Sequence, residues 1–329
     1  MSTRTFRKAL DMKLHAPPDP LSLIVLVAVL GGCIASSHFV QSPVALPYSP
    51  PSVPMVVDGG RVNSFGTFGY VLGCTKTGEG AIVDPGGRPE MFMKLAEHHG
   101  ITINKILLTH EHLDHVSAAA KLARLTNATI FMHLDGFGMY RAYGVPVPFA
   151  SSGIWEHPLL LRMAGVLGGL LLQIDYAQPP SDVQFVTDGD HLAVGAIRLR
   201  VVHLPGHSQG SVAFVSELFG IIFAGDVAMG GVVGRTDLPG CNGASMAKSL
   251  RLLRGELARA PTSAVLFTGH APPIMAAAEL ARNPSLRNQW HFWRSHFYWN
   301  SIPVLLFTGA AAYSCGSCLS RHRVGVKQI

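Results

Sequence analysis

The sequence predicts an α/β layered protein, and three observations support this fold class. Apolar runs of strand length alternate with segments of helix length along the middle of the chain. Turn residues, such as the run Asp84-Pro85-Gly86-Gly87, separate these runs. Hydrophobic residues make up 48% of the 329 residues and charged residues only 14%, so a sizeable core can form. We therefore expect one large folded domain at residues 55–287, between a leader at 1–54 and a tail at 288–329.

The expected elements of this domain fall on either side of a long insertion at residues 134–182. Before the insertion we expect strands at 70–72, 81–83, 106–108 and 129–132, and helices at 89–99 and 116–125. After it we expect strands at 183–185, 192–194, 198–203, 211–215, 221–224 and 264–267, and a helix at 245–257. The insertion holds an apolar run at 159–174, which a lid, a membrane-resting helix or additional core would explain equally well.

Both ends of the chain suggest contact with a membrane. Residues 21–35 are apolar and follow a basic stretch, which fits a signal peptide, an uncleaved anchor or an organelle presequence. A Pro/Ser-rich linker follows at about 42–54. Residues 295–320 carry no formal charge, follow a group of aromatic residues and end at Arg321, so this tail is a candidate transmembrane helix. We expect a membrane-associated protein, or one targeted to an organelle or the secretory route.

The distribution of charge argues against a nucleic-acid partner. The formal net charge is +6, but residues 1–20 and 288–329 carry all of it, and residues 21–287 are neutral in sum. A protein that binds nucleic acid usually carries a basic patch on its folded body. Basic residues beside apolar segments are instead typical of membrane topology.

The strongest motif is Thr109-His110-Glu111-His112-Leu113-Asp114-His115, which follows an apolar strand and precedes a helix. Side chains on such a loop can converge above the edge of a sheet. His110 and His112 can face one metal ion, and Asp114 and His115 can face a second ion beside it. Imidazole and carboxylate suit Zn²⁺, which we expect first, and also iron or manganese. Glu111 is expected to point outward.

Three shorter motifs each close an apolar strand and complete the predicted site. Gly206-His207 brings a histidine that can reach the first ion. Gly225-Asp226 brings a carboxylate that can bridge both ions. Gly269-His270 brings a histidine that can complete the second ion. Each motif alone carries little information, but all four in this order predict a site for two divalent metal ions.

This order of motifs resembles the metallo-β-lactamase superfamily over about residues 55–287. The resemblance implies a four-layer αβ/βα sandwich. It also implies that His110, His112 and His207 hold one metal ion, that Asp114, His115 and His270 hold the other, and that Asp226 bridges them. Asp84-Pro85-Gly86-Gly87, the run from Gly234 to Gly240 and Asn283-Pro284-Ser285-Leu286 look like the glyoxalase II-type branch in its single-domain form.

The branch implies a thioesterase of the hydroxyacylglutathione hydrolase type. A hydroxide between two ions would attack the carbonyl of a small thioester, which can be derived from glutathione. Asp114 and Asp226 are the residues expected to act in catalysis. Arg235 and Asp237 are expected to lie outside the metal ligands and to brace their loop. The separate helical domain with which larger glyoxalase II enzymes grip glutathione has no match here, and the insertion and tail stand in its place.

Two other readings remain open at this stage. Persulfide dioxygenases resemble the same branch, including its Gly-Arg-Thr-Asp run, and hold one iron with ligands that would correspond to His110, His207 and Asp226. A membrane-tethered binding protein without catalysis would be expected to lack one or more ligands, and none is missing. Among the other histidines, His203 is expected to be packed and hydrogen-bonded, and His133 to lie on the surface or in a loop.

Overall fold

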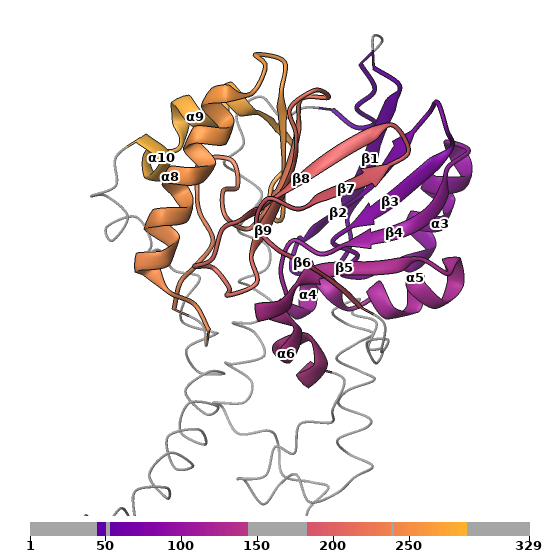
Figure 1. Ribbon diagram of the computed structural model, residues 1–329, viewed down its shortest axis with the longest axis horizontal. Helices are drawn as coiled ribbons and strands as arrows, with labels where there is room; N and C mark the ends of the chain where they lie inside the picture. The colour runs from indigo at the N-terminus through magenta and orange to yellow at the C-terminus, as the bar shows by residue number, and fades with distance from the viewer. Residues whose placement is uncertain (1–44, 51–52, 144–182, 238–239, 288–329) are drawn as a thin grey trace, which may run out of the picture. The chain divides into compact units, whose positions relative to one another are not determined.

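The computed structural model describes residues 45–50, 53–143, 183–237 and 240–287, and these form two six-stranded sheets with helices on their outer sides (Figure 1). Both sheets keep the order of the chain, so that neighbours in sequence are neighbours in space. The first sheet consists of β1 (Met55–Arg61), β2 (Phe68–Cys74), β3 (Glu79–Val83), β4 (Thr102–Leu107), β5 (Thr129–His133) and β6 (Gln184–Val186). The second consists of β7 (His191–Val194), β8 (Ile197–His203), β9 (Val212–Ser216), β10 (Ile221–Gly225), β11 (Val265–Thr268) and β12 (Ile274–Met275).

The strand directions follow the connections between strands. β1, β2 and β3 pair antiparallel through short turns, whereas β3, β4, β5 and β6 pair parallel. In the second sheet only β10 and β11 pair parallel, and the long helix α8 (Gly243–Arg259) lies between them in sequence. Parallel neighbours need such a crossover, while antiparallel neighbours need only a turn.

The helices cover the outer faces of the sheets and complete four layers. α3 (Pro89–His98) and α5 (Ala119–Thr126) lie on the first sheet, while α8, α9 (Ala276–Arg282) and α10 (Pro284–Arg287) lie on the second (Figure 1). One apolar core lies between the two sheets and contains Tyr70, Phe214, Phe223 and Phe267. A second core lies between the first sheet and its helices, and a third lies between the second sheet and its helices. The predicted four-layer αβ/βα sandwich is confirmed.

Most of the expected elements are present, but one expected helix is divided in two. The predicted helix at 116–125 is two helices, α4 (Leu113–Val116) and α5. At the break, the Ala118 amide donates to the Pro85 carbonyl and the Ser117 hydroxyl donates to the Gly86 carbonyl. These bonds tie the break to the turn after β3, next to the histidine loop. The sequence did not predict β1, β12, α9, α10 or α6 (Leu134–Tyr143).

The two ends of the chain and most of the insertion are not described. Part of the predicted linker is described, and it packs on the domain: Tyr48 pairs with Val57 of β1 and packs against the core between the sheets. The apolar segments at 21–35, 159–174 and 295–320 lie outside the described residues, so their association with a membrane stays a prediction. Among the described residues, no helix is long and apolar enough to cross a membrane.

Candidate metal centre

The histidine motif begins in the loop after β4, with His110 and His112, and ends in the short helix α4, which contains Asp114 and His115. Asp84, at the end of neighbouring β3, fixes the start of this loop. Its carboxylate accepts hydrogen bonds from the Thr109 amide at 2.7 Å and the Thr109 hydroxyl at 2.6 Å. The loop therefore leaves the sheet in a fixed direction, and its side chains are held rather than solvated.

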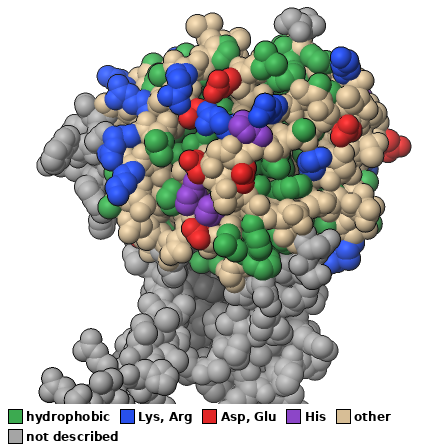
Figure 2. Space-filling view, in the orientation of Figure 1, with side chains coloured by type: hydrophobic (Ala, Val, Ile, Leu, Met, Phe, Trp, Pro, Cys, Tyr) green, Lys and Arg blue, Asp and Glu red, His purple; other side chains and the backbone are tan. Residues whose placement is uncertain are grey.

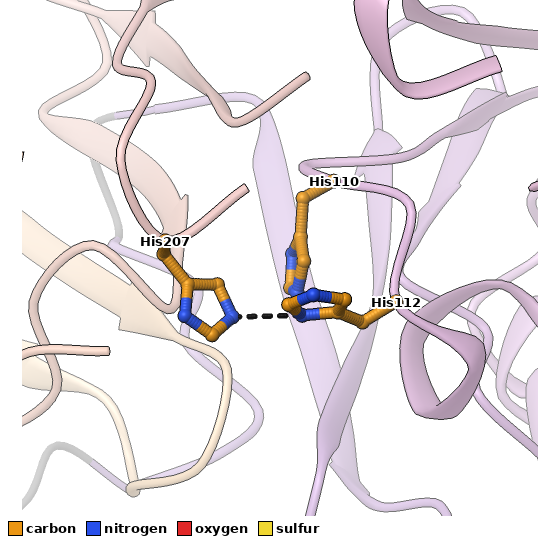
Figure 3. Close-up of side chains that lie close together, drawn as sticks. All are labelled: His110, His112 and His207. Atoms are coloured by element: carbon orange, nitrogen blue, oxygen red, sulfur yellow. Dashed lines mark hydrogen bonds between the residues drawn. The ribbon is translucent and has the colours of Figure 1, made fainter. Parts of the chain in front are cut away.

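His110, His112 and His207 form the first group of candidate ligands (Figure 3). His207 comes from the loop after β8 of the other sheet, and its ring faces the two rings of the motif. Nδ1 of His112 lies 2.9 Å from Nε2 of His207, and the two rings stand at 89°. His110 Nε2 is buried and has no hydrogen-bond partner.

Asp114, His115 and His270 form the second group. His270 Nε2 lies 3.2 Å from Asp114 Oδ2 and 3.3 Å from His115 Nε2. His115 Nε2 lies 3.5 Å from the same carboxylate oxygen. His270 follows β11 of the second sheet, so this group too joins both halves of the domain.

Asp226, immediately after β10, contacts both groups. Its Oδ2 lies 3.3 Å from His207 Nε2 of the first group and 3.3 Å from His270 Nε2 of the second. Its Oδ1 lies 3.5 Å from His115 Nε2 and has no hydrogen-bond partner although it is buried. This is the position that a bridging carboxylate needs.

The residues present fit two divalent metal ions. Ligand atoms around one tetrahedral zinc ion, with bonds of about 2.0–2.2 Å, lie about 3.3–3.6 Å from one another. The ligand contacts within the second group and around Asp226 lie at 3.2–3.5 Å. Burying His110 Nε2 and Asp226 Oδ1 without a partner costs free energy unless a cation satisfies them. The orphaned atoms and the spacing together favour metal binding over a network of hydrogen bonds alone.

The electrostatics of the first group and of Asp226 also suit a metal centre. Burial and the neighbouring His207 lower the pKa of His112 to about 3, and burial with His115 and His112 holds the pKa of His110 well below its usual value. Both rings are therefore neutral and offer lone pairs at neutral pH. Burial opposes ionisation of Asp226, but His270 and His115 outweigh it and hold its pKa well below the usual range. Neutral imidazoles and ionised carboxylates are the forms that bind metal. In the second group burial lowers the pKa of His115 and of His270, but Asp114 and Asp226 outweigh it and raise both, so a metal ion there would take the place of a proton.

A second set of contacts orients the candidate ligands through their outer atoms. His115 Nδ1 lies 3.0 Å from Asp84 Oδ2, and the Thr67 hydroxyl donates to Asp114 Oδ2 at 2.7 Å. His207 Nδ1 lies 2.9 Å from the backbone carbonyl of Arg235, and His270 Nδ1 lies 3.2 Å from that of Phe65. Histidines that bind metal almost always use the other ring nitrogen in this way.

Gly269 allows the second group to close around Asp226. A Cβ atom at this position would overlap Asp226 Oδ1 and would approach His115 Cε1 to 2.8 Å. Only a residue without a side chain lets the backbone come this close to the carboxylate. Steric crowding at this position therefore explains why a glycine precedes His270.

The residues expected outside the ligand set behave as a brace. The Arg235 guanidinium donates two hydrogen bonds of 2.7 Å to the Asp237 carboxylate, and both side chains are partly exposed. The contact from Arg235 to the ligand His207 runs through its backbone carbonyl. Bracing of the loop is thus the role that the contacts support.

Two expectations about this region were wrong. Glu111 does not point outward: it is only 2% exposed, and it accepts a hydrogen bond of 2.6 Å from the Ser208 hydroxyl. It therefore ties the histidine loop to the loop that carries His207. His133 is not on the surface but is buried, with its ring stacked on that of His203.

Asp84, Thr67 and Asn63 were missed as supporting residues. Asn63 donates to the Asp114 carbonyl at 2.8 Å and to the Gly86 carbonyl at 3.0 Å. Asp84 has φ of 48°, an uncommon conformation at the end of a buried strand. The Asp-Pro-Gly-Gly run was the only signal in the sequence that this aspartate had a task beyond a turn.

Two facing sheets that both supply histidine and carboxylate ligands define the class of this protein, an α/β protein with a site suited to two metal ions. Comparison with known proteins gives the family. Residues 64–270, well over half of the chain, match the metallo-beta-lactamase superfamily, and the chain belongs to it.

Individual relatives are similar along nearly their whole length. The probable metallo-hydrolase YqgX of Bacillus subtilis is 28% identical over 62% of this chain and 86% of its own. The hydroxyacylglutathione hydrolase GloC of Haemophilus influenzae is 29% identical over 64% of this chain and 88% of its own. The crystal structure of TTHA1623 in a di-iron-bound form is 26% identical, covers 73% of this chain and 99% of its own, and has a TM-score of 0.51. The family and these relatives indicate a hydrolase that depends on divalent metal ions.

Proposed function

We propose that this protein hydrolyses thioesters of the hydroxyacylglutathione type. The observation that carries the proposal is that the seven candidate ligands lie in two adjoining groups, with Asp226 in contact with both. The similarity to the hydroxyacylglutathione hydrolase of Haemophilus influenzae supports the substrate class. Zinc is the ion we expect, and iron suits the same ligands.

The residues of the chain hold the reacting groups in place. When bound, two such ions would supply hydroxide at neutral pH and positive charge for the oxygen of a carbonyl under attack. Asp226 lies between the two groups, because its Oδ2 is 3.3 Å from His207 of the first group and 3.3 Å from His270 of the second. Asp114 has one oxygen fixed by the Thr67 hydroxyl and directed at His270, so its carboxylate can orient a water beside the metal.

The surface and the charge favour a small substrate over nucleic acid. On the face shown in Figure 2, acidic side chains lie between the Lys and Arg side chains, and histidines lie beside acidic groups. The body of the chain is neutral in sum. A phosphate backbone would need a concentrated basic surface.

The test is metal content and thioester hydrolysis measured on the same sample of the full-length chain. We expect close to two ions per chain and release of thiol from a hydroxyacylglutathione. Asp226→Ala should lose both second-ion binding and at least about a thousandfold in kcat/KM, since metal ions supply several kcal/mol to the barrier. Asp190→Ala, an exposed aspartate in the turn before β7, is the matched control and should keep both.

The other outcome points to the alternative chemistry. One iron per chain, oxygen uptake with glutathione persulfide and no release of thiol from a thioester would replace the hydrolase with a dioxygenase. In that case His110, His207 and Asp226 would be the three iron ligands. Full metal loading with neither activity would leave a binding protein.

A further inference from the structure

The run Asn283-Pro284-Ser285-Leu286, on which the resemblance to the glyoxalase II-type branch partly rests, lies outside the candidate ligand set. It joins α9 to α10, and its first residue, Asn283, is completely buried. The Asn283 backbone amide donates to the Glu279 carbonyl at 2.9 Å, in the last turn of α9. A buried amide side chain needs partners for its nitrogen and its oxygen, so the contacts of Asn283 indicate its role.

The Asn283 side chain uses both ends of its amide. Its oxygen accepts a hydrogen bond of 3.0 Å from the Ser285 amide, which caps the start of α10. Its nitrogen donates to Glu279 Oε1 at 2.8 Å and to the Val232 carbonyl at 3.1 Å. The cap needs only the oxygen, so the cap and the contact with Val232 depend on different atoms of one side chain.

Val232 belongs to a tight turn at residues 229–232, in the loop between β10 and α8. The Met229 amide donates to the Val232 carbonyl at 2.8 Å and closes the turn. The two central residues are glycines with positive φ, a conformation that glycine adopts without steric cost. Glu279 interacts with the same turn: burial raises the pKa of its carboxyl, and the two glycine amides oppose this shift. The end of α9 therefore holds the turn through two buried side chains.

The same loop packs against two candidate metal ligands a few residues further on. The Gly234 amide donates to the Asp226 carbonyl at 2.7 Å, and the Arg235 carbonyl lies 2.9 Å from His207 Nδ1. A Cβ atom at Gly234 would overlap the Asp226 carbonyl oxygen and approach His207 Nδ1 to 2.6 Å. One residue separates Gly234 from Val232. Because peptide units are planar and of fixed length, a displacement of the turn is passed on to both ligands.

We propose that Asn283 is a positioning residue of the metal centre, which holds the turn at 229–232 through the Val232 carbonyl and thereby fixes His207 and Asp226. Glu279 orients the Asn283 amide for this contact, since it accepts from the same nitrogen. Asn283 itself contacts none of the candidate ligands and acts through the backbone of the loop. The inference rests on the dinuclear centre of the proposed function, but not on the identity of the substrate.

The experiment measures the zinc affinity of the full-length chain by competition with a chromophoric chelator, and the visible absorption spectrum of the chain loaded with Co²⁺, which reports ligand geometry. Asn283→Ser keeps an oxygen that can cap α10 but removes the amide that reaches Val232. We expect zinc affinity to fall about tenfold, as for other groups that support a metal ligand, and the Co²⁺ spectrum to change. Asn104→Ser removes an amide that donates to Glu79 at 3.1 Å in the first sheet, and this matched control should change neither.

A purely structural role for Asn283 would give a different result. Unchanged zinc affinity and an unchanged Co²⁺ spectrum in a folded Asn283→Ser would overturn the inference, whatever the melting temperature, and leave Asn283 as the cap of α10. If circular dichroism shows that this variant is unfolded, Asn283→Asp decides in the same assays, because it keeps the volume and the capping oxygen but has no amide. Failure of the wild-type chain to bind Zn²⁺ would remove the dinuclear centre itself, and the inference with it.

Discussion

The two halves of the domain supply the metal centre in different ways. The first half provides four of the seven candidate ligands from one short segment, His110 to His115, which comprises the end of the loop after β4 and most of α4. The second half provides three single residues, His207, Asp226 and His270, each after a different strand. The ligands of this segment are neighbours in the chain, whereas the other three become neighbours only through the pairing of β8, β9, β10 and β11.

The support for the ligands differs in the same way. Side chains hold the ligands of the first half: Asp84 contacts His115, and Thr67 contacts Asp114. Backbone carbonyls hold the histidines of the second half, those of Arg235 and Phe65. The first half should therefore be sensitive to substitution of supporting side chains, and the second to changes in backbone position.

The largest effect after loss of a ligand is expected from Gly269→Ala in the second half. The new Cβ overlaps Asp226 Oδ1, so the bridging carboxylate must move away from His115. We expect kcat/KM for thioester hydrolysis to fall about a hundredfold, because displacement of a reacting group by about 1 Å has an effect of that size. Gly60→Ala in β1, whose Cβ would meet no atom within 4 Å, is the control and should keep full activity. Equal activity in the two variants would show that backbone position does not limit this half.

The next effect is expected from Asp84→Asn in the first half. Asparagine keeps the shape of the side chain and tolerates the positive φ of 48°, but it removes the negative charge beside His115 Nδ1. We expect metal affinity to fall about 10- to 100-fold. The measurement is zinc affinity by competition with a chelator, accompanied by the melting temperature. Loss of thermal stability in the metal-free chain alone, with metal affinity unchanged, would make Asp84 a structural residue only.

A smaller effect is expected from Arg235→Ala. The ion pair with Asp237 is partly exposed, and such pairs contribute about 0–1 kcal/mol. The carbonyl that holds His207 is still present in the variant. We expect kcat/KM to change less than about fivefold. A loss of a hundredfold would mean that the guanidinium itself contacts substrate, and the division between side-chain and backbone support would then fail.

The smallest effect concerns Glu279, a buried carboxyl in α9 that lies outside the site. Burial raises its pKa above the ordinary value of 4.5, although Asn283 donates a hydrogen bond to it. The folded state therefore favours the protonated form, and this contribution to stability is present below pH 4.5 and is lost as the pH rises through the folded-state pKa. The free energy of unfolding of Glu279→Gln, relative to that of the wild-type chain, should increase with pH above 4.5. A difference that is constant with pH in urea titrations would contradict this assignment.

The sequence indicated the candidate ligands, which the structure brings together, better than the residues that support them. The candidate ligands form local sequence patterns. His110, His112, Asp114 and His115 lie within six residues, and His207, Asp226 and His270 each follow a glycine at the end of an apolar strand. The four-layer fold followed from the resemblance that these motifs carry. The supporting residues form no such pattern, since Thr67 and Asp114 lie 47 positions apart and form a contact only after the sheet has formed.

The errors have the same cause. Glu111 stands between two candidate ligands in the sequence and is directed away from them. The direction away from the ligands was expected to be the direction toward solvent. In the structure the second sheet covers that side, and Ser208 meets the carboxylate there. His133 was expected on the surface or in a loop, yet it ends β5, and His203 of the other sheet packs on it. Contacts between the two sheets are the part of the structure that local patterns do not contain.

The strictly sequential order of the strands in both sheets has a consequence for biosynthesis. Within each sheet, every strand after the first pairs with the one made just before it, so the first sheet can be assembled once residue 186 has left the ribosome. Short separations between contacting segments also favour rapid folding. The centre itself lacks a ligand until His270 has been made, close to the end of the domain. We therefore expect the nascent chain to acquire its sheets first and its full complement of metal last.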